Sequence, residues 1–111
     1  APPAHYMLYF LTDSTLFTDE SKLLFEEVIA SVKRIKPAEV SVVGHTDRVG
    51  SGAMNFLLGF KRAAQVKNLL VKRGVAEEIV EISSHGEDNP LIKTDDNVSE
   101  PKNRRVEIVI R

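Results

Sequence analysis

The sequence predicts a two-layer α/β sandwich, an α+β fold in which helices cover one face of a mixed four-stranded sheet. Two long segments carry apolar residues at helical spacing, and four short apolar runs around them are typical of strands. The resulting order is βαβαββ, and helices that alternate with strands and end on a strand pair pack on a shared sheet. With 111 residues, the chain is long enough for one such domain.

The first strand is expected over residues 5–11, an apolar and aromatic run. We interpret residues 1–4 as a linker and residues 5–111 as the domain. The first helix should begin near Thr18 or Asp19, either of which can cap it, and it should stop at Pro37. Its apolar face consists of Leu24, Phe25, Val28, Ile29, Val32 and Ile35.

The second half of the chain should contain a strand over 39–44, a helix over 55–73, and strands over 79–84 and 103–110. Asn55 is the expected N-cap of the second helix and Gly74 the glycine after its end. Residues 85–102 read as polar turn and loop, with a short helical turn as an alternative. The residues expected on the buried sides are Phe56, Leu58, Ala63, Val66, Leu69 and Leu70 in the helix, and Val106, Ile108 and Ile110 in the final strand, whose alternate residues are Arg105, Glu107 and Val109.

The stretch from Gly44 to Gly52 indicates a binding loop. It holds three glycines in nine residues, which permit close backbone approach to a ligand, and it leads into a helix start that favours anions. Because helical side chains lean toward the N-terminus, we expect Arg62 to reach back so that Asp47 and Arg62 share a pocket. The alternative is that Asp47 and Arg62 only bridge each other and pin the loop.

The composition limits which classes of partner we expect the chain to bind. The net charge is −1 and 28% of residues are charged, so we expect no bulk attraction to nucleic acid or anionic lipid. The absence of cysteine excludes disulfides and thiolate metal sites, and no apolar run is long enough to insert into a membrane. Because the chain opens with Ala-Pro-Pro-Ala and not with methionine, we expect it to be one domain of a longer protein.

Several spaced motifs together resemble the OmpA-like peptidoglycan-binding domain family. They are Gly44-His45-Thr46-Asp47, Gly50, Asn55, Leu58, Arg62-Ala63, Val66, Gly74, Gly86-Glu87, Pro90 and Asn103-Arg104-Arg105-Val106. The resemblance spans nearly the whole chain and implies a βαβαββ domain in the periplasm, as part of a cell-envelope or outer-membrane-associated protein. It also implies that Asp47 and Arg62 grip the diaminopimelate end group of the peptidoglycan peptide stem, non-covalently and without catalysis.

The remaining expected ligand contacts are less direct: Asn55, Thr46, Arg48, Val49, Gly50 and Leu58 from the loop and helix, Asp13 from the rim, and Arg105. Of Arg104 and Arg105, we expect one to buttress the loop and the other to face solvent. Two features depart from the family pattern. Gly59 places a glycine inside a helix, and Arg48-Val49 places a cation beside the pocket, where it could hold a carboxylate or crowd an ammonium.

Other functions remain as alternatives. A wall hydrolase would need a nucleophile with a base or a carboxylate pair in one pocket, and no convincing group is present. An anion- or phosphate-binding module, or a protein-interaction module, could use the same glycine loop, but no Gly-Lys-Ser/Thr ending follows it. His45 is expected to be structural and to bond loop backbone, and no metal or cofactor is expected, since His5 and His85 lie in unrelated segments.

Overall fold

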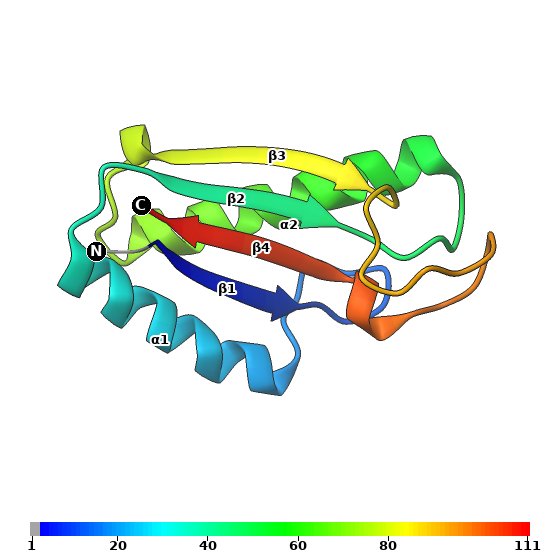
Figure 1. Cartoon of the computed structure of the whole chain (residues 1–111), viewed down its shortest axis with the longest axis horizontal. Coiled ribbons are helices and arrows are strands. Elements are labelled where there is room, and N and C mark those ends of the chain that lie inside the picture. Colours follow the sequence, from blue (N-terminus) through cyan, green and yellow to red (C-terminus); the bar gives the residue numbers. More distant parts are fainter. Residues whose placement is uncertain (1–2) are drawn as a thin grey trace.

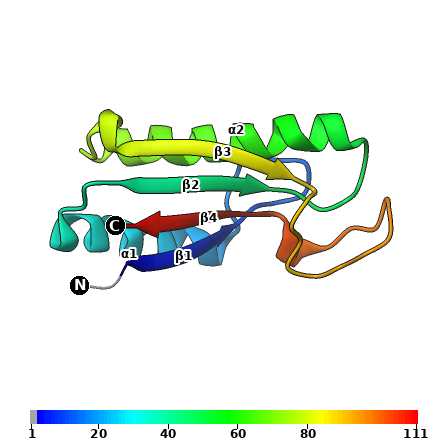
Figure 2. The same ribbon diagram turned by 45° about the horizontal axis from the view of Figure 1, so that its top comes forward.

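Four strands form one mixed sheet in the order β1-β4-β2-β3, and both helices cover the same face of it (Figures 1 and 2). The elements are β1 Ala4–Tyr9, α1 Asp19–Ile35, β2 Val40–His45, α2 Gly52–Lys72, β3 Val80–Gly86 and β4 Arg105–Ile110, with short 3₁₀ helices at Glu77–Ile79 and Pro101–Asn103. The β2–β3 pair is parallel and the other two pairs are antiparallel. The predicted fold class is confirmed. None of the helices in the described part of the chain is long and apolar enough to cross a membrane.

The first strand lies slightly earlier than expected. This computed structural model describes residues 3–111, so residues 1 and 2 of the expected linker lie outside the described range, and Ala4 already belongs to β1. β1 ends at Tyr9 because its pairing with β4 ends there. Phe10 then forms only an isolated bridge to Phe17, so the chain turns two residues before the predicted end.

The sequence signals at the two ends of α1 predicted the position of this helix correctly. The Oγ1 of Thr18 accepts a hydrogen bond from the N–H of Ser21 at 3.3 Å, as an N-cap should. At the other end, Lys36 adopts a left-handed conformation with φ of 52°, and its N–H donates to the carbonyl of Val32 at 2.9 Å. The helix therefore ends at Ile35, two residues before Pro37, at which the sequence predicted a stop.

The prediction that Asn55 caps α2 is wrong. The helix begins at Gly52, and its N-cap is Ser51, whose Oγ accepts from the N–H of Met54 at 3.2 Å. Asn55 is buried in the first turn, and its Nδ2 donates to the carbonyl of Val49 at 3.0 Å and to Glu87 Oε1 at 3.1 Å. Serine and asparagine cap equally well, so residue type alone could not choose between them.

Gly44 and Gly59 explain how α2 sits on the sheet. A Cβ at Gly44 would overlap the carbonyl oxygen of Gly59, and a Cβ at Gly59 would overlap Ser84 Oγ. The glycine inside the helix is thus the point of closest contact with β2 and β3. Because residue 59 faces the sheet, Phe56 falls on the flank of α2 and is exposed, contrary to the prediction that it is buried.

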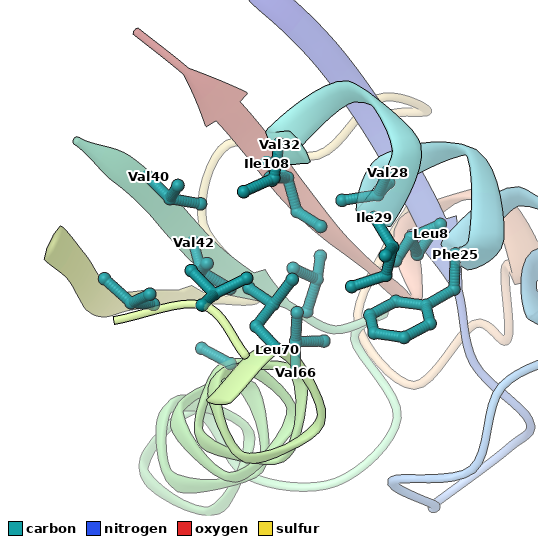
Figure 3. Packing of buried hydrophobic residues seen from close by; sticks show 14 of the residues in the cluster. Leu8, Phe25, Val28, Ile29, Val32, Val40, Val42, Val66, Leu70 and Ile108 are labelled. Carbon is teal, nitrogen blue, oxygen red and sulfur yellow. The ribbon is translucent and has the colours of Figure 1, made fainter. Parts of the chain in front are cut away.

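The core lies between the sheet and the two helices (Figure 3). Val106, Ile108 and Ile110 of β4 are each 0% exposed, so the predicted register of the final strand is confirmed. Between β3 and β4 the chain follows a long loop that is tied down by Asn103, whose side chain bonds both the N–H and the carbonyl of Ile92 at 2.9 and 2.7 Å. This loop ends in the short helical turn that the sequence left as an alternative.

Replacing Ile108 by alanine should cost about 2–5 kcal/mol of unfolding free energy, because it opens a cavity between β4 and the helices. Denaturant unfolding monitored by circular dichroism measures this loss. Val109, on the other face of β4, provides the matched control, and its replacement by alanine should cost clearly less. Equal losses at the two positions would contradict the assigned register.

Candidate functional site

A cleft of about 350 Å³ lies where the β1–α1 loop, the loop after β2 and the start of α2 meet. These segments gather at the right-hand end of the sheet in Figure 1. Seven of the ten residues predicted for the site line it: Asp13, Asp47, Val49, Gly50, Asn55, Leu58 and Arg62. One cleft therefore brings together most of the residues predicted for the site, including Asp47 and Arg62.

Asp47 is buried and held by three contacts. Its Oδ2 pairs with Arg104 Nη1 at 3.0 Å and accepts from the N–H of Glu100 at 3.3 Å, and its Oδ1 accepts from the N–H of Val49 at 3.2 Å. Arg104 is thus the residue that buttresses the loop. The carboxylate is oriented in advance and keeps unused acceptor capacity for a ligand.

Arg62 is fully buried, with 0% of its surface exposed. Its Nε, Nη1 and Nη2 donate to the carbonyls of Ser14, His45 and Leu11 at 2.9, 3.0 and 3.2 Å. Burial lowers the pKa of Arg62 to about 10, although the nearby Asp47 carboxylate opposes the shift, so the guanidinium stays charged at neutral pH. Three of its five N–H donors are used, which leaves two.

The simple bridge between Asp47 and Arg62 is not what pins the loop. Among the described residues, the ion-pair partner of Asp47 is Arg104, and Arg62 makes its hydrogen bonds to backbone carbonyls. The two charged groups line the same cleft without neutralising each other directly.

Three predicted contacts lie outside the cleft. Thr46 is buried, and its Oγ1 donates to the carbonyl of Asp47 at 2.8 Å, so it shapes the loop from behind. Arg48 turns away and pairs with Glu87 at 3.3 Å and with Asp96 in a separate hollow. It therefore neither holds a carboxylate in the cleft nor crowds an ammonium there.

Arg105 lies on the uncovered face of the sheet. Its Nε donates to Glu107 Oε2 at 2.8 Å and its Nη2 to the carbonyl of Asn89 at 3.0 Å. It is buried, as is Arg104, so the prediction that one of these two arginines faces solvent is wrong. Arg105 is the first residue of β4 and Arg104 directly precedes the strand, and the two side chains have different partners: Arg104 pairs with Asp47 and Arg105 with Glu107.

One wall of the cleft consists of three α2 residues that were not predicted as ligand contacts: Met54, Leu57 and Lys61. Met54 and Leu57 are exposed apolar side chains. Residues 54, 57, 58 and 61 have the i, i+3, i+4 spacing that places side chains on one flank of a helix. The sequence therefore contained the pattern that identifies this wall. It was missed because the helix was expected to begin at Asn55, after Met54.

His45 is structural, in a different way from the one predicted. Its Nε2 lies 3.4 Å from Glu107 Oε2 and its ring stacks on His85 with a centroid distance of 5.4 Å, while its Nδ1 has no hydrogen-bond partner among the residues that the structure describes. Within residues 3–111, no group of three or more side chains is arranged to hold a metal ion.

The buried His45 should make stability depend on pH. Burial, helped by the charge of Arg105 and opposed by that of Glu107, lowers the pKa of His45 to about 4. Between pH 6.5 and about 4 the unfolded chain binds this proton and the folded chain does not, so stability falls as pH falls. The loss attributable to His45 should reach about 3 kcal/mol at the lower end of this window.

Unfolding measurements at pH 7 and pH 4.5 on the wild type, His45→Gln and His5→Gln test this expectation. His5 is half exposed and serves as the control. Only His45→Gln should reduce the difference in unfolding free energy between pH 7 and pH 4.5. An unchanged difference in that variant would show that other titratable groups cause it.

Comparison with known proteins adds independent information. The model of the OmpA family matches residues 9–104. A protein named peptidoglycan-associated lipoprotein from Legionella pneumophila is 36% identical over 112 residues, covering 98% of this chain and 61% of the relative. An outer membrane protein from Gluconacetobacter diazotrophicus is 30% identical over 115 residues, covering 98% of this chain and 30% of the relative. The chain thus spans about a third to three fifths of the length of these relatives.

A solved structure agrees with this result. The peptidoglycan-associated lipoprotein from Burkholderia pseudomallei superposes with a TM-score of 0.82 at 30% identity, over 95% of this chain and 89% of that structure. The mixed four-stranded sheet and two helices are therefore an arrangement already known.

Proposed function

Since this chain belongs to the OmpA family, we propose that it binds peptidoglycan without catalysis, through the diaminopimelate end group of the peptide stem. Relatives are named as peptidoglycan-associated proteins, and the cleft has a matching pair of charges. In this proposal the domain works in the periplasm and anchors a larger envelope protein to the cell wall.

The observation that carries the proposal is that a carboxylate and a guanidinium line one cleft. The diaminopimelate end group presents an ammonium and a carboxylate on one carbon. Asp47 would accept from the ammonium with the capacity that Arg104 and the loop N–H groups leave free. The two remaining N–H donors of Arg62 would bind the carboxylate.

Arg62 has no exposed surface, so direct contact requires a small rearrangement of the cleft wall. Leu58 and Lys61, the α2 residues beside it, would have to shift as the ligand enters. Arg62 would then have two roles, since it also holds the β1–α1 loop and the end of β2 together through Leu11, Ser14 and His45.

Phosphate binding is less compatible with this site. The N–H of Met54 at the α2 N-terminus is already capped by Ser51, and the buried Asp47 in the same cleft would repel an anion that carries no ammonium. Incubation with insoluble peptidoglycan sacculi, followed by analysis of the supernatant, separates the classes. Sedimentation of the domain without release of muropeptides supports the binding module, and release would indicate a hydrolase.

A diaminopimelate-type stem peptide should bind more tightly than a lysine-type stem peptide. In the lysine-type stem the side chain ends in an ammonium with no carboxylate beside it, so Asp47 would stay paired while Arg62 lost its partner. One charge-assisted hydrogen bond is worth about 1.5–3 kcal/mol, or roughly 10- to 150-fold in affinity. Titration by calorimetry or NMR shifts measures the ratio.

An amidated diaminopimelate stem is the matched ligand control, since it keeps the ammonium and size of the ligand and removes one negative charge. It should bind with an affinity closer to that of the lysine-type stem. Equal affinities for the diaminopimelate-type and lysine-type stems would show that the cleft does not recognise the carboxylate.

A further inference from the structure

The two edges of the sheet differ in how they are covered. At the β1 edge, the N–H of Tyr9 donates to Ser21 of α1 at 2.7 Å, and Tyr6 bonds to Ser31 of the same helix. At the other edge, β3 pairs only with β2 among the described residues, and it forms the upper edge of the sheet in Figure 1. Natural edge strands often carry lysine or proline, which discourage pairing, and β3 has neither in its seven residues. Its charged residue is Glu81, and its pairing with β2 is regular up to Ser84, with an irregularity at His85.

Two exposed aromatic side chains of α2 lie beside the β3 edge. Phe56 and Phe60 of α2 are 51% and 42% exposed and lie one turn apart. Ser84 Oγ of β3 donates to the carbonyl of Phe56 at 2.8 Å, which places this flank at the end of β3. The opposite flank of α2, with Leu57 and Lys61, faces the cleft, so the two phenylalanines project toward the outer side of β3.

We propose that β3 pairs antiparallel with β3 of a second copy of this chain, forming a two-fold dimer with a continuous eight-stranded sheet. The register centred on Ser83 pairs residues 81–85 of the two strands and stops short of Gly86, whose φ of 54° lies outside the extended range. In this register Ser83 faces Ser83 of the second copy across the axis, and Glu81 faces His85 of the second copy twice. Phe56 and Phe60 of each copy cover the new strand pair on the helix side.

Charge complementarity selects this register. Glu81, Ser83 and His85 are exposed on the uncovered face of the sheet. Asn89 contacts Nδ1 of His85 at 3.3 Å, which leaves Nε2 to donate to the facing Glu81 carboxylate. A register centred on Glu81 would bring two carboxylates face to face, which destabilises a strand pair. The clefts stay open because they lie on the other flank of α2, so the inference does not depend on the proposed function.

Cysteine cross-linking tests the register, since the chain contains no cysteine. Residues facing each other across antiparallel strands have Cα atoms about 4.5–5.5 Å apart, within the range of a disulfide. Ser83→Cys should therefore cross-link readily under mild oxidation. Glu81→Cys is the matched control, because its two copies would lie about 13 Å apart at ~3.3 Å per residue. An equal mixture of Glu81→Cys and His85→Cys chains should form the mixed disulfide.

Sedimentation velocity on the cysteine-free chain from micromolar to near-millimolar concentration tests the dimer itself. We expect a reversible monomer–dimer equilibrium that Ser83→Lys weakens by about tenfold or more, because two ammonium groups would face each other at the axis. Phe60→Ser should also weaken it, and Leu57→Ser on the other flank should not. A monomer at all concentrations, or Glu81→Cys cross-linking as fast as Ser83→Cys, would overturn the proposal.

Discussion

Arg62→Ala is expected to lower the free energy of unfolding by about 5 kcal/mol or more, because three hydrogen bonds to a charged group are worth about 1.5–3 kcal/mol each. The substitution leaves the carbonyls of Leu11, Ser14 and His45 without their donor and removes a buried side chain that lies 5.2 Å from the Phe10 ring centroid. Such a loss is a large part of the roughly 5–15 kcal/mol that stabilises a typical domain.

This result would change how binding data are interpreted. If Arg62 were only a ligand contact, its removal would leave the fold intact, whereas in the structure its hydrogen bonds join the β1–α1 loop to the end of β2. Thermal and denaturant unfolding of Arg62→Ala measures the effect. Arg48→Ala is the matched control, since Arg48 is a partly exposed arginine paired with carboxylates outside the cleft, and its loss should lower the free energy of unfolding far less than the loss of Arg62. Similar stabilities of the two variants would contradict the structural role.

Asp47→Asn should weaken binding to diaminopimelate-containing sacculi by roughly 30- to several thousand-fold, which corresponds to the 2–5 kcal/mol typical of losing one partner of a buried charge pair. The asparagine has the same size and can still accept from the N–H of Val49 or Glu100, so the loop keeps part of its support. The ammonium of the ligand would lose its anion, and the positive charge of Arg104 would be left unpaired beside it.

Because Asp47 also stabilises its loop, the binding assay needs a stability measurement beside it. Sedimentation with sacculi should be compared at a temperature where circular dichroism shows Asp47→Asn to be folded. Asp96→Asn removes the same charge from a mostly exposed carboxylate outside the cleft and should bind as the wild type does. Wild-type binding by a folded Asp47→Asn variant would exclude Asp47 as the ammonium ligand.

Much of the fold could be predicted from the sequence because its signals are local. The apolar spacing of α1, the cap at Thr18 and the stop at Pro37 act within a few residues, and the structure has the helix where they place it. The alternation in β4 likewise determined which of its residues face the helices, since a strand has only two faces. The start of α2 was misplaced by three residues because Ser51 and Asn55 are equally good caps, and only the contacts of Asn55 with Val49 and Glu87 decide between them.

The candidate site likewise has features that the sequence predicted and features that only the tertiary structure determined. The loop motif and helix spacing by themselves pointed to Asp47 and Arg62 in one cleft, and the cleft contains both. The pairing of Asp47 with Arg104, 57 residues away, and the burial of Arg62 under the β1–α1 loop were decided only by tertiary structure. Which charges meet, and whether they are open to solvent, depends on how distant segments pack, and no local pattern records those distances. For that reason Arg48 and Arg105, plausible by their place in the motifs, lie outside the cleft, while Arg104 lies inside it.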